Sequence, residues 1–309
     1  MSVIRSQPNR AELFDFYGRI WRALGRSQVA RTNFGARIRC DLGDLIPSRI
    51  FHFGFWEPNL SYYLWKTLSA GDVFVDVGAN IGYYSLLGAK RVGDTGSIVA
   101  IEASPRIFAR LQHNLEANAA TNVRAVNLAV SGAAGTATIY AGPAQNSGAT
   151  STLRGWRNGT PEAQVAALPL DRILTESERS RTALIKIDVE GAEMPILQQL
   201  LSSLERYPRC IAIIVECNPA NDDLRLVLDR FNAKGFQAYE VLNRYDAAWY
   251  LDWRQPAEVH RLQGFTTAQA DILLCRESAG PFARLCQRCR SAVESCICRD
   301  ERRAYIPRD

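Results

Sequence analysis

Residues 72–90 read DVFVDVGANIGYYSLLGAK. The apolar run 73–77 is typical of a strand that is buried on both faces, and it ends at Gly78. Gly82 follows four residues later and opens an apolar stretch with helical spacing. Glycines let the chain turn tightly and let the backbone approach a ligand closely. The stretch therefore predicts a strand, a tight turn and a helix, with a candidate small-molecule site at the turn.

Strands and helices alternate for about two hundred residues around this unit. Further strands are expected at 97–103, 123–130, 183–189 and 210–217, and helices at 82–91 and 105–119. The segments TATIY and QVAAL, within 131–168, are expected to form a hairpin. Strands at 236–242 and 270–276 follow one another without a helix, which favours an antiparallel edge. We expect an α/β, doubly wound, Rossmann-like fold with a mostly parallel seven-stranded sheet and an antiparallel edge strand.

The two ends of the chain differ from this pattern. Residues 11–26 have apolar side chains on one helical face, and residues 34–56 alternate as a short strand pair would. Both ends are rich in arginine, within a net charge of +5. A solvated surface is the favoured interpretation of these basic ends, and an anionic partner is the alternative. We expect no nucleic-acid partner, and the oligomeric state stays open.

No secretory signal and no run of eighteen apolar residues is present. The sequence therefore predicts a cytoplasmic protein without a transmembrane segment.

A carboxylate stands twenty residues beyond the glycine turn. The dinucleotide fingerprint G-x-G-x-x-G is incomplete, because Ala79-Asn80 replaces its middle glycine, which argues against a bound pyrophosphate. Glu102 ends the second strand, where a carboxylate can accept hydrogen bonds from both ribose hydroxyls. An adenosine without phosphates indicates S-adenosylmethionine, whose ammonium Asp76 could face. A nicotinamide-dependent oxidoreductase and a non-catalytic protein that binds a cofactor or an anion remain the alternatives.

The motifs DVFVDVGANIGYYS, IEASP, NLAVSGAAGTATIY and LIKIDVEGAE resemble the FkbM-type family of S-adenosylmethionine-dependent methyltransferases over roughly residues 50–275. The resemblance implies methyl transfer to a hydroxyl oxygen, mostly of sugars, glycans or natural products. It puts Gly78, Asn80, Gly82 and Glu102 at cofactor-binding positions. It puts Asp188 where the methionine end of the cofactor meets a small-molecule or glycan acceptor.

A hydroxyl is a weak nucleophile, so a general base near the sulfonium methyl would help the transfer. Asp188 and Glu190, at the end of the 183–189 strand, are the predicted catalytic residues, and His260 is a rival. The polar loop 146–151 could close over the cofactor or shape the acceptor site. We expect no bound metal, although whether a divalent ion assists these carboxylates stays open.

Eight cysteines divide into two groups. Cys40, Cys210, Cys217 and Cys275 are expected to be reduced and buried. The others could close a tetrahedral zinc site, although a reduced tail is favoured: Cys286, Cys289, Cys296 and Cys298. We therefore divide the chain into an extension (1–50), a methyltransferase domain (51–276) and a tail rich in cysteine and arginine (277–309).

Overall fold

The computed structural model describes residues 20, 27–143, 145–155, 158–217, 223–253, 259–262 and 269–276. All of the helix expected at 11–26 except Ile20, and all four tail cysteines, lie outside these residues. The division into three parts stays a prediction.

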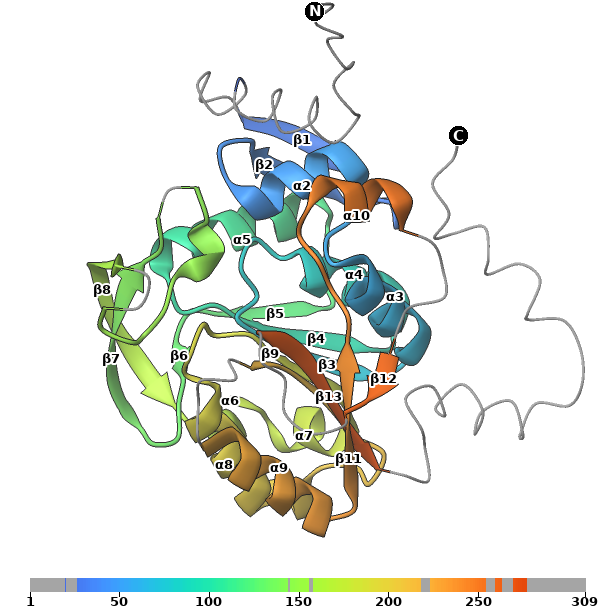
Figure 1. Cartoon of the computed structure of the whole chain (residues 1–309), viewed down its shortest axis with the longest axis vertical. Coiled ribbons are helices and arrows are strands. Elements are labelled where there is room, and N and C mark those ends of the chain that lie inside the picture. The colour runs from blue at the N-terminus through green and yellow to red at the C-terminus, as the bar shows by residue number, and fades with distance from the viewer. Residues whose placement is uncertain are drawn as a thin grey trace, which may run out of the picture.

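A central sheet of eight strands organises the described chain (Figure 1), in the order β12-β11-β13-β10-β9-β3-β4-β5. Its parallel strands include β3 (Val73–Val77), β4 (Ser97–Ile101), β5 (Val123–Val126), β9 (Thr182–Ile187) and β10 (Ala212–Cys217). The remaining strands are β11 (Phe236–Val241), β12 (Val259–Arg261) and β13 (Ala270–Arg276). The doubly wound α/β fold is confirmed.

Two details of the sheet differ from the sequence prediction. The sheet has eight strands, because the short β12 adds to one edge and pairs antiparallel with β11. The second antiparallel strand, β13, lies between β10 and β11 and not at an edge. β13 is almost wholly buried there, which suits its apolar sequence better than an edge position would.

Helices cover both faces of the sheet (Figure 1). One core lies under α2 (Leu45–Phe53), α3 (Pro58–Thr67), α4 (Tyr83–Val92) and α5 (Pro105–Ala117). The other lies under α6 (Leu170–Ile173), α8 (Glu193–Ser203) and α9 (Asp223–Ala233). The short helices α7 (Glu176–Arg181) and α10 (Ala247–Asp252) complete the helical layers. Ser104 caps α5 by accepting a hydrogen bond from the Ile107 N–H, as its place before Pro105 leads one to expect.

Two smaller sheets flank the central one. The predicted hairpin is confirmed as β7 (Gly135–Ala141) and β8 (Thr160–Leu168), with the two-residue β6 (Ala129–Val130) beside β8. The strand expected at 123–130 is therefore divided between β5 and β6. Near the N-terminus, β1 (Ser27–Arg31) pairs with β2 (Arg37–Asp41).

The second strand of the pair expected within residues 34–56, at SRIFHFGFW (48–56), was wrong, because Leu45–Phe53 form helix α2. Gly54, at φ 78°, ends this helix with a left-handed residue, so Phe51 and Phe53 follow helical and not strand geometry. His52 lies in helix α2 and His113 in helix α5. Cys40, Cys217 and Cys275 are buried, but Cys210 is exposed because it lies in the turn that precedes β10.

No helix among the described residues has the length and the apolar character that a membrane span requires.

Candidate functional site

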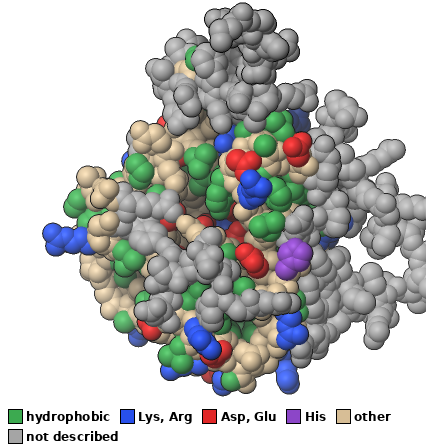
Figure 2. Space-filling model, viewed as in Figure 1, with side chains coloured by type: hydrophobic (Ala, Val, Ile, Leu, Met, Phe, Trp, Pro, Cys, Tyr) green, Lys and Arg blue, Asp and Glu red, His purple; other side chains and the backbone are tan. Residues whose placement is uncertain are grey.

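A cavity of about 270 Å³ opens at the carboxyl ends of β3, β4, β9 and β10. This is the edge of an open α/β sheet where ligands bind. One part of the wall is apolar and includes Ile107, Leu128, Val130 and Ile139. Another part carries carboxylates, and Figure 2 likewise shows several Asp and Glu side chains near the middle of one face. The cavity can therefore hold a ligand with one apolar end and one polar end.

The glycine turn forms the floor of this cavity. Gly78 has φ 81°, and a Cβ atom there would lie 1.8 Å from the backbone oxygen of Asp188. Only glycine allows the loops after β3 and β9 to approach so closely. Asn80 also lines the cavity and has φ 49°, a left-handed conformation that asparagine tolerates better than most residues.

Glu102 lies in the cavity wall at the end of β4, and it is fixed by backbone hydrogen bonds. Its two carboxylate oxygens accept from the N–H groups of Asn80 and Ser104, each at 2.9 Å. The side chain is almost wholly buried, and this desolvation raises the pKa of Glu102 to about 7. The two bonds hold the carboxylate in one orientation, and each oxygen keeps a lone pair for a ligand hydroxyl.

Two of the predicted cofactor-binding residues lie outside the described cavity wall. Asp76 is completely buried and accepts a hydrogen bond of 2.6 Å from the Ser85 hydroxyl, and desolvation raises its pKa. Gly82 begins helix α4 at φ 90° and packs against Leu111. In this structure both residues therefore contact the start of helix α4, on the side of the glycine turn that faces away from the cavity.

Asp188 lines the cavity and forms an ion pair with Lys186, whose ammonium lies 2.7 Å from the Asp188 carboxylate. Lys186 is buried, and its ammonium sits 4.9 Å from the centroid of the Tyr84 ring. The lysine thus holds the Asp188 carboxylate in place from beneath the cavity.

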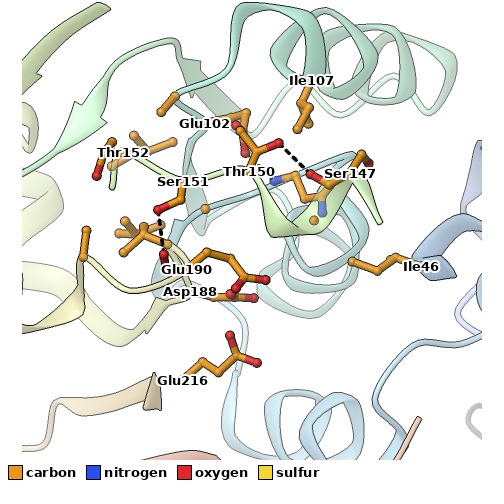
Figure 3. A pocket seen from close by; sticks show the side chains of 18 of the residues that line it. Ile46, Glu102, Ile107, Ser147, Thr150, Ser151, Thr152, Asp188, Glu190 and Glu216 are labelled. Carbon is orange, nitrogen blue, oxygen red and sulfur yellow. Dashed lines mark hydrogen bonds between the residues drawn. The ribbon is translucent and has the colours of Figure 1, made fainter. Parts of the chain in front are cut away.

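Glu190 is the second predicted catalytic residue and also lines the cavity. It has φ 55°, a strained conformation for a residue with a side chain. Its backbone oxygen accepts a hydrogen bond from the Ser151 hydroxyl at 2.7 Å. Asp188 and Glu190 therefore line the same cavity, and both are labelled in Figure 3.

Residues 145–151 form the roof of the cavity. The backbone N–H and the hydroxyl of Ser147 both donate to the Asp44 carboxylate, from the segment between β2 and α2. Thr150 donates to the Ser147 backbone oxygen at 2.8 Å (Figure 3). The predicted role of loop 146–151 in covering the site therefore has a structural basis.

The rival base His260 is exposed on strand β12 and is not among the described residues of the cavity wall. Within the described part of the chain, no three His, Cys, Asp or Glu side chains are arranged to hold a metal ion. The zinc hypothesis for the tail cysteines concerns residues outside that part.

Glu57, Tyr245 and Glu216 also line the cavity and were not among the predicted site residues. Glu57 is buried, has φ 40°, and accepts hydrogen bonds from the hydroxyls of Tyr84 and Tyr245, at 2.6 and 3.0 Å. Tyr245 stacks on Trp56, with ring centroids 5.3 Å apart. Glu216 ends β10. Two of these residues carried a sequence signal: Glu57 stands in the Trp56-Glu57-Pro58 motif, which resembles a recurring feature of the FkbM family, and Glu216 is a charged residue at the end of an apolar strand.

Two comparisons with known proteins match this chain to methyltransferases. The family described as "Methyltransferase FkbM domain" matches residues 76–238, just over half of the chain. A curated relative, "Methyltransferase 1" of Beauveria bassiana (strain ARSEF 2860), is 29% identical over 179 residues, which are 52% of this chain and 71% of the relative.

Solved structures with a similar fold have low sequence identity. An S-adenosylmethionine-dependent O-methyltransferase from Thermotoga maritima is 14% identical, with a TM-score of 0.41 over 81% of this chain and 77% of that one. TYW2 of P. horikoshii, solved in complex with MeSAdo, is also 14% identical, with a TM-score of 0.42 over 82% and 73%. Likenesses at this level carry no argument about the reaction.

Proposed function

This chain belongs to the FkbM methyltransferase domain family, and we propose that it transfers a methyl group from S-adenosylmethionine to a hydroxyl oxygen of a sugar, glycan or natural product. Glu102 is the observation that carries the proposal. Its carboxylate is fixed by two backbone N–H groups in the wall of a cavity with an apolar end. A ribose bound there would place the adenine against the apolar wall and the methionine arm along the Gly78 turn.

Transfer requires the acceptor oxygen to approach the sulfonium methyl in line with the bond that breaks. The new oxygen–carbon bond forms as the carbon–sulfur bond breaks, and S-adenosylhomocysteine leaves. The hydroxyl proton passes to a carboxylate, and we assign that role to Asp188 or Glu190, which both line the cavity. Lys186 holds one oxygen of the Asp188 carboxylate at 2.7 Å, so any proton that Asp188 takes would go to its other oxygen.

Asp76, Gly78, Asn80 and Gly82 complete the proposed cofactor site in two ways. Gly78 and Asn80 line the cavity, so their backbone can contact the cofactor directly. Asp76 and Gly82 act from beneath, by fixing the start of helix α4 through Ser85 and Leu111.

The experiment is a calorimetric titration of the purified chain with S-adenosylhomocysteine and, separately, with NAD. We expect micromolar binding of S-adenosylhomocysteine and none of NAD, since the middle glycine of the dinucleotide fingerprint is missing. Binding of NAD alone would overturn the proposed cofactor. For the reaction, a ¹³C-methyl cofactor and NMR of the product distinguish an O-methyl group from an N-methyl or C-methyl group.

A further inference from the structure

Glu216 stands at the carboxyl end of β10, in the cavity wall and one strand beyond Asp188. Val215 of β10 is in register with Ile187 of β9, so Glu216 and Asp188 lie next to each other at the sheet edge. On its other side, Glu216 lies directly opposite Asp271 of the antiparallel strand β13. Figure 3 shows the Glu216 carboxylate pointing toward those of Asp188 and Glu190.

The carboxylates around Glu216 make its position electrostatically unfavourable for a second negative charge. Residues directly opposite on antiparallel strands put their side chains on the same face, and like charges in such a pair destabilise the sheet. Asp271 is buried and accepts a hydrogen bond of 2.6 Å from the Asn243 side chain. Burial, and then the negative charges of Asp188 and Asp271, raise the pKa of Glu216 well above its usual value.

Within the described part of the chain, Glu216 has neither a hydrogen bond nor an ion pair, whereas three neighbouring carboxylates are engaged. Tyr84 and Tyr245 hold Glu57, two backbone N–H groups hold Glu102, and Lys186 holds Asp188. A partly buried carboxylate that faces a cavity without a donor is suited to a donor supplied by a ligand.

The charge of the whole wall favours a cationic donor. The described residues of the wall include five carboxylates, and no Lys, Arg or His is among them: Glu57, Glu102, Asp188, Glu190 and Glu216. A phosphorylated or carboxylated acceptor would disfavour ionisation of these carboxyl groups further, whereas a protonated amine would stabilise the ionised form of the carboxylate that it binds. The stacked rings of Trp56 and Tyr245 line the same cavity and add π-faces that attract cations.

The order of the strands separates Glu216 from the ribose site. Glu102 ends β4, and β3 and β9 lie between β4 and β10. Neighbouring strands are about 4.8 Å apart, and three such spacings separate β4 from β10, so the strand end that carries Glu216 is roughly 14 Å from the one that carries Glu102. Between them lie Gly78 and Asp188, where the methionine arm is proposed to run. Glu216 is therefore on the acceptor side of the cofactor.

We propose that Glu216 binds a protonated amine on the methyl acceptor, so that the acceptor is a hydroxylated amine such as an amino sugar. The inference rests on the proposed function, because it assumes that the cofactor occupies the Glu102 side. An organic ammonium fits better than a metal ion, since no group of three ligating side chains forms among the described residues.

The test compares the unaltered protein with Glu216→Gln, which keeps the shape and removes the charge. Glu205→Gln is the matched control, because Glu205 is exposed and remote from the cavity wall. Thermal unfolding first checks that each variant is folded. Titration with S-adenosylhomocysteine then tests the cofactor side alone. We expect the same affinity, within roughly twofold, for all three proteins.

The acceptor side is tested by titrating three sugars into each protein with S-adenosylhomocysteine already bound. Glucosamine is the cationic sugar, glucose the neutral one and glucuronate the anionic one. We expect glucosamine to bind the unaltered protein and the control variant at least roughly tenfold more tightly than the other two, as for a charge-assisted hydrogen bond. In Glu216→Gln this preference should disappear.

Three results would overturn the inference: no binding of glucosamine, binding of glucose or glucuronate equal to it, or a preference that survives in Glu216→Gln. A fourth is loss of S-adenosylhomocysteine affinity in Glu216→Gln, because Glu216 would then hold the ammonium of the cofactor. Failure of S-adenosylhomocysteine to bind the unaltered protein would instead refute the proposed function.

Discussion

Replacing Glu102 by alanine should weaken the binding of S-adenosylhomocysteine by roughly 30- to 140-fold at pH 8. A hydrogen bond to a charged group contributes about 1.5–3 kcal/mol, and a factor of ten in affinity is about 1.4 kcal/mol. The estimate counts the ribose bonds to Glu102 as contributing about 2–3 kcal/mol together, because each replaces a bond to water. Alanine also releases the N–H groups of Asn80 and Ser104, which loosens the wall.

The pH dependence gives a second, independent signature. Because burial raises the pKa of Glu102 to about 7, most of this carboxyl is protonated at pH 6 and ionised at pH 8. The ionised form is the better acceptor for two hydroxyls. Affinity in the unaltered protein should therefore rise by about tenfold between pH 6 and pH 8, since about one carboxyl in ten is ionised at pH 6.

Calorimetric titration at both pH values measures these effects, with Glu116→Ala as the control because Glu116 is exposed on α5. The control should bind like the unaltered protein at each pH. The reasoning fails if Glu102→Ala, shown to be folded, binds S-adenosylhomocysteine as tightly as the unaltered protein. It also fails if Glu102→Ala keeps the full rise in affinity between pH 6 and pH 8.

The remaining predictions concern the turn, the roof and a buried acid. Gly78→Ala should lower the melting temperature sharply and abolish cofactor binding, because its Cβ would collide with backbone at 1.8 Å, whereas Gly135→Ala has open space and should change neither. Ser147→Ala removes the hydroxyl bond to Asp44 and should weaken S-adenosylhomocysteine binding by roughly fivefold, as the loss of one hydrogen bond implies; unchanged titrations would show that the roof does not contact the cofactor. Burial raises the pKa of Glu193 to about 7, so its contribution to stability is full below its unfolded pKa and is lost as the pH rises through about 7. The melting temperature of Glu193→Gln, minus that of the unaltered protein, should therefore increase between pH 5 and pH 8. A difference that stays constant over this range in thermal unfolding would contradict the prediction.

The central part of the fold could be predicted because its signals are local. Buried parallel strands read as apolar runs, and glycines at 78 and 82 together with Ser104-Pro105 mark where helices begin. The order of the strands was harder, because nothing in residues 270–276 states that β13 inserts between β10 and β11. Residues 45–53 were misread because an apolar segment of nine residues satisfies both strand and helix patterns.

The candidate site was predictable where one motif supplies several residues. Gly78, Asn80 and Glu102 lie in the cavity wall, and so do Asp188 and Glu190. Cavity residues that come from segments far apart in the sequence could not be found from a motif. Glu57 and Tyr245 are 188 positions apart, and only the folded chain brings the tyrosine hydroxyl to the carboxylate. Asp76 lies outside the described cavity wall, and the sequence does not show that its side chain is completely buried and accepts a hydrogen bond from Ser85.

A crystal structure of the chain with S-adenosylhomocysteine tests the central claim most directly. The account predicts both ribose hydroxyls within hydrogen-bond distance of Glu102, the adenine against Ile107 and Leu128, and the sulfur facing Asp188 and Glu190. Ligand density elsewhere, or a ribose that does not contact Glu102, would contradict it.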